Sequence, residues 1–97
     1  MEMQRKENEE ELNRVHSLTG VFIRKARMSA NLRQSDLALL LGITQVYLSK
    51  LERGKCRWSL VRFINACRVL EIPRTEVKNF LSKLQNEVIV QRGSHKS

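Results

Sequence analysis

The most informative part of this 97-residue chain runs from Gln34 to Gly54 and reads QSDLALLLGITQVYLSKLERG. Apolar residues three and four positions apart predict a short amphipathic helix over its first eight residues. Gly42 then suits the left-handed position that ends a helix, and Thr44 is a favoured N-cap for a second helix that runs to about Arg53. The stretch therefore predicts two short helices joined by a tight turn, with polar side chains on the outer face of the second.

Three further helices are expected around this pair. Their boundaries follow from capping and helix-opening residues: Ser17 or Thr19 to Met28, a start near Ser59, and an opening at Pro73 or Thr75. Apolar residues at helical spacing give each helix a face that should be buried: Val21, Phe22 and Ala26 with Leu18 nearby, then Leu60, Phe63, Ile64, Cys67 and Leu70, then Val77, Phe80, Leu81 and Leu84. The sequence therefore predicts an all-α domain of five helices over residues 17–86.

The two ends of the chain differ from this helical middle. Residues 1–16 form a charged arm, for which a frayed helix and disorder fit the sequence equally well. Residues 87–97 form a C-terminal extension in which Val88, Ile89 and Val90 have high β-propensity and follow no helical period. A short C-terminal strand that serves dimerisation is one interpretation of this extension.

The net charge of +8 is spread unevenly along the chain. Residues 1–11 contain five glutamates against one arginine and one lysine, so the positive charge lies in the remainder. A small domain this basic is expected to bind a polyanion, although solubility alone is the plainer explanation of surface charge. No apolar run approaches the ~20 residues that span a bilayer, and no signal peptide is expected at the acidic start.

Residues from about Gly20 to Leu81 resemble the Cro/CI/Xre-type helix-turn-helix family of bacterial and phage DNA-binding regulators. The matching residues keep a fixed spacing: Ile23-Arg24, Arg27, Leu32, Gln34, Leu37-Ala38, Leu41-Gly42-Ile43-Thr44, and Leu48-Ser49-Lys50-Leu51-Glu52-Arg53-Gly54. The resemblance does not extend to residues 1–16 or 87–97. It implies a lambda-repressor-like fold in which the second helix of the motif enters the major groove of DNA.

Four side chains of this second helix are candidates for contacts with base edges. The Gln45 amide suits bidentate contact with adenine, Val46 could touch a thymine methyl group, Lys50 could reach guanine, and Ser49 could serve as a shorter contact. The resemblance implies that Gln45, Val46 and Lys50 read the sequence. The alternative is that these are solvated helix positions without a ligand.

Phosphate contacts are expected on both sides of the reading helix. The family implies that Gln34 binds a phosphate, where the start of its helix also favours an anion. Further candidates are polar or basic neighbours of the two helices: Arg33, Tyr47, Arg53, Lys55 and Arg57. Each basic residue is as readily explained as an idle surface charge.

Two residues of the motif are expected to be structural. The family pattern implies a largely buried ion pair between Arg27 and Glu52, which would tie the first helix to the end of the third. Trp58 either caps the core beside the fourth helix or lies against the DNA backbone, and capping is favoured.

One such motif makes few base contacts, so specificity usually comes from a two-fold dimer on a palindrome. Two dimer surfaces fit the sequence: a strand formed by Val88, Ile89 and Val90 that pairs with its counterpart, or the fifth helix acting through Phe80 and Leu84. The alternative is that the apolar C-terminal residues only cover their own core.

No catalytic, cofactor or metal-binding pattern accompanies the motif. The four glycines are scattered, His16 and His95 are expected in flexible ends, and Cys56 and Cys67 form no disulfide framework, which favours a reducing, cytoplasmic, nucleoid-associated location. The prediction is a non-enzymatic, sequence-specific regulator that binds double-stranded DNA as a dimeric repressor. The alternative is an antitoxin-like or coactivator-like module that holds a protein partner, a toxin or RNA polymerase, and which the acidic arm favours. An aromatic content of 5% counts against RNA binding.

Overall fold

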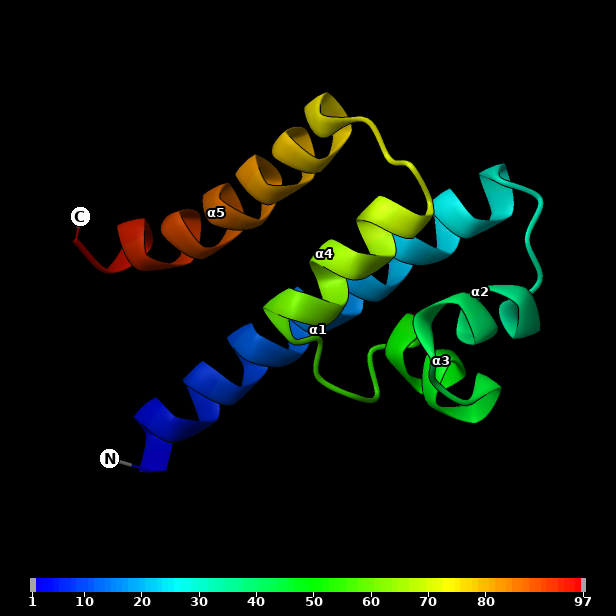
Figure 1. Ribbon diagram of the computed structural model, residues 1–97. Helices are drawn as coiled ribbons and strands as arrows, with labels where there is room; N and C mark the ends of the chain where they lie inside the picture. The colour runs from blue at the N-terminus through cyan, green and yellow to red at the C-terminus, as the bar shows by residue number, and fades with distance from the viewer. Residues whose placement is uncertain (1, 97) are drawn as a thin grey trace.

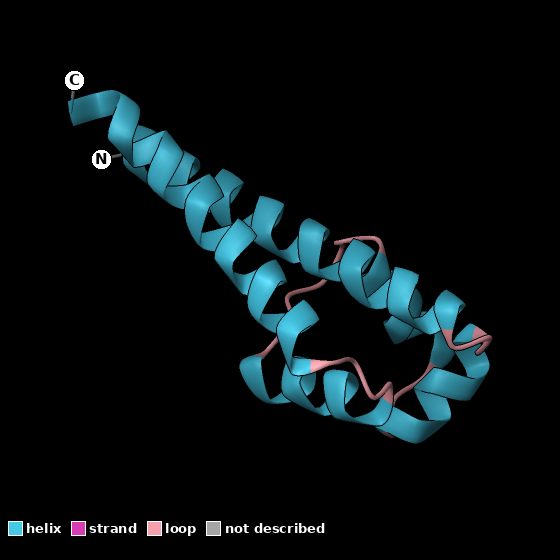
Figure 2. Ribbon diagram, turned by 90° about the horizontal axis from the view of Figure 1, so that it is seen from above, coloured by secondary structure: helices cyan, strands magenta, loops and turns pink. Residues whose placement is uncertain are grey.

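Five helices make up the computed structural model, which describes the backbone of residues 2–96 and the side chains of residues 9–87. They are α1 (Glu2–Ser29), α2 (Gln34–Leu41), α3 (Gln45–Glu52), α4 (Leu60–Val69) and α5 (Arg74–Lys96). Figure 1 shows α2 and α3 as a short pair at one end, while α1 and α5 extend toward the opposite side, where both termini lie. Figure 2 shows helices and connecting loops throughout, and no strand occurs in residues 2–96. The all-α, five-helix prediction is confirmed.

The turn between α2 and α3 forms as its residue types predict. Gly42 has a φ of 69°, in the left-handed region, and its N–H donates to the Leu39 carbonyl. Thr44 is the N-cap of α3, and its hydroxyl accepts a hydrogen bond of 3.1 Å from the Tyr47 N–H. Ser59 caps α4 in the same way through the Arg62 N–H. These local hydrogen bonds fix where α3 and α4 begin.

The core lies between α1, the α2–α3 pair and α4. Four large side chains are fully buried, Ile23, Leu37, Leu48 and Leu51, and they are joined by Ala38, Trp58, Phe63, Ala66 and Cys67. On α1 the buried side chains are Thr19, Ile23 and Arg27, spaced four apart, whereas Val21 is exposed. The predicted buried face of α1 was therefore partly wrong, because the row of residues that packs against α3 lies to one side of the predicted face.

The predicted buried stripe of α4 also needs correction. Phe63 and Cys67 are buried as expected, but Leu60 is 73% exposed and Ile64 is 56% exposed. Ala66, which the sequence analysis omitted, is fully buried instead. The helix has apolar residues on two sides, so periodicity alone could not say which side packs. On α5, Leu81 is likewise exposed while Val77, Phe80 and Leu84 are half-buried.

Gly20 lies where α1 crosses α3. A Cβ atom at this position would come within 2.5 Å of the Leu51 and Glu52 carbonyl oxygens. No side chain fits there, so the glycine allows the two helix backbones to approach. Close contact between α1 and the end of α3 is thus set by a residue that otherwise weakens a helix.

The C-terminal strand prediction is wrong. Residues 88–90 belong to α5, which runs without a break from Arg74 to Lys96. Each β-branched residue lowers the stability of a helix by only a fraction of a kcal/mol. A strand, in contrast, needs a partner strand, which the described chain does not offer. The charged arm is likewise part of a continuous α1, so His16 lies within a helix and not in a flexible end. His95 also falls within α5.

Candidate nucleic-acid interface

The first turns of α3 present a row of polar and apolar side chains to solvent. Gln45 and Lys50 are exposed, Val46 is 67% exposed, and Ser49 is half-buried. On the opposite side of the same helix, Leu48 and Leu51 are fully buried. The helix is therefore held by one face, and the four candidate base-reading side chains lie together on the remainder.

A buried hydrogen-bond network sets the direction of this helix. Arg27 on α1 forms a bidentate ion pair with Glu52 at the end of α3, with Nε–Oε2 at 2.7 Å and Nη2–Oε1 at 3.1 Å. Arg27 Nη1 also donates to the Leu32 carbonyl at 2.8 Å, just before α2. Gln34, the first residue of α2, donates its side-chain amide to Glu52 Oε1 at 3.0 Å. One carboxylate and one guanidinium thus connect α1, α2 and α3.

The role of Gln34 in this network was missed by sequence reasoning. The residue was expected at a phosphate, but its side chain is half-buried and held by Glu52. The backbone N–H groups of the first turn of α2 have no partner inside the helix and still point out of its N-terminus. These backbone N–H groups are the donors at this position that remain suited to an anion.

Arg33 stands beside this helix start as an exposed cation. Its guanidinium lies 3.3 Å from Asp36 Oδ2, and its backbone N–H donates to the same oxygen at 2.9 Å. These hydrogen bonds hold the pKa of the Asp36 carboxyl below its usual value, and the Arg33 side chain contributes more than the Arg33 backbone. The pair is solvent-exposed, so the guanidinium can exchange its carboxylate for another anion at little cost.

The loop after α3 carries the second group of cations. Arg53, Lys55 and Arg57 are all exposed, and Arg53 Nε donates to the Ser49 carbonyl at 3.3 Å. Gly54, between them, has a φ of 73° and packs closely against Ser17 of α1. The loop is therefore fixed to α1 while its basic side chains face solvent.

Trp58 anchors the far end of this loop. Its ring is buried, and Nε1 donates to the Leu51 carbonyl at 3.1 Å. Its backbone N–H donates to Nδ1 of His16 on α1 at 2.9 Å. Burial, and next the charge of Arg57, lower the pKa of His16, which favours the neutral ring that accepts this bond. The structure places Trp58 as a core cap; nothing in the sequence pointed to His16.

Tyr47 and Arg62 form another contact beside the reading helix. Tyr47 is half-buried, and the Arg62 guanidinium lies 5.2 Å from the centre of its ring. A cation over an aromatic face is attracted by the ring and is held in one place by it. Arg62, from α4, therefore adds a cation near α3 that sequence reasoning did not find.

The residues expected at a dimer surface lie away from α2 and α3, and Phe80 and Leu84 pack beside α1. The Phe80 ring stacks on Phe22 with centroids 4.2 Å apart, and Phe63 is 5.9 Å away. Leu84 is half-buried beside the same part of α1. The side chains of Val88, Ile89 and Val90 lie outside the described residues. Exposed apolar side chains occur on other helices: Leu39 and Leu40 on α2, and Leu60, Val61 and Ile64 on α4.

Residues 9–87 contain no cluster of three or more histidine, cysteine or acidic side chains that could hold a metal ion. Cys56 and Cys67 are free thiols, and burial raises the pKa of Cys67 to about 11, so it stays protonated in the core. No described helix is both long and apolar enough to cross a membrane.

Comparison with known proteins agrees with this geometry. A family model described as helix-turn-helix matches residues 23–77, which include every candidate base-reading and phosphate-binding residue. The clp gene regulator ClgR from Corynebacterium glutamicum has a similar structure, with a TM-score of 0.63 and 23% identity over 71% of this chain and 88% of that one. The restriction-modification controller protein C.Esp1396I gives a TM-score of 0.60 at 23% identity, over 77% of this chain and 95% of that one. No curated protein sequence matches the chain.

Proposed function

The chain belongs to the Xre/Cro/CI-type helix-turn-helix family of DNA-binding regulators, and on that premise we propose that it is a dimeric repressor of transcription that recognises a palindromic operator. Bound with α3 in the major groove, it would occlude the promoter within the cytoplasm, at the nucleoid. The observation that carries the proposal is the exposed start of α3, fixed from behind by the Arg27–Glu52–Gln34 network and bordered by cations on two sides.

Base reading is assigned to the four exposed or half-exposed positions of α3. The Gln45 amide matches the donor and acceptor of adenine in the major groove, and Lys50 matches the acceptors of guanine. Val46 supplies an apolar surface for a thymine methyl group, and Ser49 a short polar contact. These chemistries differ from one another, so together they specify several neighbouring base pairs.

Phosphate binding is assigned to the two ends of the motif. Arg33 and the first turn of α2 would hold one backbone, where the helix dipole also favours an anion. Arg53, Lys55 and Arg57 would hold the other, with Tyr47 and the Arg62 guanidinium over its ring as further contacts. Such contacts orient the protein and supply salt-dependent affinity without reading sequence.

Dimerisation is assigned to α5. C.Esp1396I has been crystallised as a tetramer with its natural 35 base-pair operator, which supports an assembly of more than one copy for this chain as well. Because residues 88–90 are helical, the dimer would form between helices and not between strands. Leu81 is exposed on α5, and we place it in the interface with the turns that contain Val88, Ile89 and Val90, while Phe80 and Leu84 support the helix from the side of α1.

Selection from a random duplex library at near-physiological salt tests the proposal. The expected result is an enriched palindrome whose half-site centres lie one turn apart, about 10 base pairs. An enriched but asymmetric single site would contradict the dimer. Absence of any motif, with binding that disappears as salt rises, would contradict the regulator itself.

A second function is favoured by a separate observation. Leu39 is 82% exposed and its neighbour Leu40 is also exposed, on α2, where the DNA proposal gives neither a role. Adjacent exposed leucines are typical of surfaces that bind another protein, here a toxin or RNA polymerase. Replacement of both by serine should abolish repression in cells without a change in operator affinity if this function holds, and should leave repression intact if it does not.

A further inference from the structure

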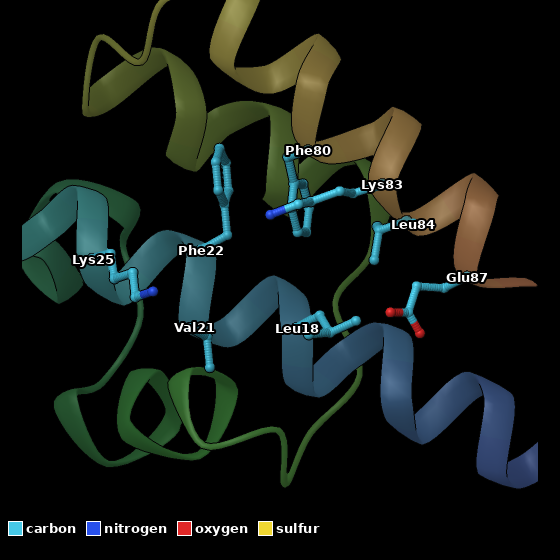
Figure 3. Close-up of a pocket in the computed structure, with 8 residues that line it drawn as sticks. All are labelled: Leu18, Val21, Phe22, Lys25, Phe80, Lys83, Leu84 and Glu87. Atoms are coloured by element: carbon cyan, nitrogen blue, oxygen red, sulfur yellow. The ribbon is translucent and has the colours of Figure 1, made fainter.

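An open groove lies between α1 and α5, away from the α2–α3 pair. Its cavity measures about 290 Å³. Figure 3 shows its two walls: Leu18 and Phe22 extend from α1, and Phe80 and Leu84 from α5. The stacked Phe22 and Phe80 rings join the two helices at one end, while Leu18 and Leu84 remain only half-buried. The groove therefore keeps apolar surface in contact with water.

Two lysines border this apolar surface, one from each wall. Lys25 belongs to α1 and Lys83 to α5, and both line the cavity. Figure 3 shows the Lys83 side chain extending across Phe80 toward α1. Among residues 9–87, neither ammonium group has an ion-pair partner within 4 Å. The groove thus combines an apolar floor with two uncompensated positive charges.

The single acidic group of the groove does not balance these charges. Glu87 lines the cavity, but its carboxylate lies 3.4 Å from Arg14 Nε of α1. The lining itself holds two lysines and one glutamate, so its net charge is positive even before this arginine is counted. An occupant that matches both properties has an apolar body and one negative charge.

We infer that the α1–α5 groove binds a small apolar carboxylate. The hydrocarbon part lies against Leu18, Phe22, Phe80 and Leu84, and the carboxylate lies between Lys25 and Lys83. The volume is at the lower limit of cavities that hold small-molecule ligands, so the ligand is small. None of the residues proposed to contact DNA lines this groove. The site is therefore separate from the proposed DNA contacts, although its α5 wall belongs to the helix to which dimerisation is assigned.

Octanoate is a suitable probe, titrated into the full chain and followed by amide chemical shifts. The expected result is saturable binding of one molecule per chain, with shifts concentrated in residues 18–25 and 80–87. Octanol, which lacks the charge, should bind at least about tenfold more weakly. Each of Lys25→Met and Lys83→Met should weaken octanoate binding about threefold, the usual size of one partly exposed ion pair.

Lys78→Met is the matched control, because Lys78 is an exposed lysine of α5 that does not line the groove. It should leave octanoate affinity unchanged. Equal binding of octanol and octanoate, equal weakening by all three lysine variants, or shifts centred on α2 and α3 would each overturn the inference. So would an octanoate affinity that falls as protein concentration rises, because the groove would then be covered by a second copy. None of these readouts uses DNA, so failure here is distinct from failure of the regulator proposal.

Discussion

The buried ion pair of Arg27 and Glu52 fixes how α1, α2 and α3 pack behind the candidate base-reading side chains. The glutamate accepts hydrogen bonds from Arg27 and Gln34, and the arginine also binds the Leu32 carbonyl. Both residues are almost fully buried. Because every charge in the network has a partner, the cost of burial is offset only while all the partners are present.

Removal of one partner should therefore be costly. Glu52→Gln keeps the shape but leaves the Arg27 charge uncompensated, which should lower the free energy of unfolding by about 3–5 kcal/mol in urea denaturation. The exposed Glu71→Gln serves as the control and should change it by less than about 0.5 kcal/mol. Equal stability of the two variants would show that the pair does not hold the helices together.

His16 gives the fold a pH dependence. Burial, and then the charge of Arg57, lower its pKa from the ordinary value of 6.5, so the folded protein binds this proton less readily than the unfolded chain. The contribution to stability is fully present above pH 6.5 and is lost as the pH falls from 6.5 toward the lowered pKa. Urea midpoints between pH 7.5 and 5 should fall in the wild type and fall less steeply in His16→Gln. Parallel curves would contradict the assignment.

The contact between α1 and α3 depends on Gly20, which lies where the two helices cross. A glycine inside an exposed helix is normally improved by alanine, by roughly 0.5–1 kcal/mol. At Gly20 the sign should reverse, because the new methyl group would meet the Leu51 and Glu52 carbonyls and force α1 away from α3. Thermal or urea unfolding of Gly20→Ala should show a loss of about 1–3 kcal/mol. Ser82→Ala, on the exposed side of α5, should be nearly neutral; a gain in stability for Gly20→Ala would refute the close approach.

At the scale of whole elements, local signals carried most of the prediction. Gly42 and Thr44 end α2 and start α3 through hydrogen bonds to near neighbours, so their residue types were sufficient. The packed face of α4 was mispredicted because that helix has apolar residues on two sides. The strand at 88–90 failed for a related reason, since β-propensity yielded to continuation of a long helix.

The candidate site also has features that local sequence predicts and features that depend on packing between helices. Exposure of Gln45, Val46 and Lys50 follows from the period of α3, which is a local property. The contacts of His16 with Trp58 and of Arg62 with Tyr47 join different helices, and no spacing in the sequence encodes them. Gln34 was recognised as a site residue, but its hydrogen bond to Glu52 depends on the packing of α2 against α3.

At the scale of the whole molecule, the acidic start of α1 and the cations near α2 and α3 lie at opposite ends. The first turns of α1, which contain the five glutamates of residues 1–11, lie at the end remote from α2 and α3 (Figure 1). The candidate phosphate-binding cations lie just before α2 and just after α3. A polyanion that approaches α3 therefore meets positive charge first, while the acidic segment stays at a distance.

This arrangement predicts two kinds of variant on a selected duplex. Lys55→Gln should weaken binding to every sequence and reduce the slope of log affinity against log salt by about 1. Gln45→Ala should leave the slope unchanged but lose about 1–3 kcal/mol of discrimination at one base pair in each half-site. Fluorescence anisotropy over a range of salt separates the two, with Lys78→Gln as a control outside the interface. A change of salt slope for Gln45→Ala, or a sequence-dependent effect of Lys55→Gln, would reverse the assignments.

The claim that α3 lies in the major groove is tested most directly by methylation interference on the duplex that library selection yields. Dimethyl sulfate places a methyl group on guanine N7, which faces the major groove, and on adenine N3, which faces the minor groove. We expect guanine N7 methylation in two half-sites, about one helical turn apart, to block binding, while adenine N3 methylation in those half-sites is tolerated. Interference at adenine N3 with none at guanine N7 would contradict the account, because the protein would then read DNA from the other groove.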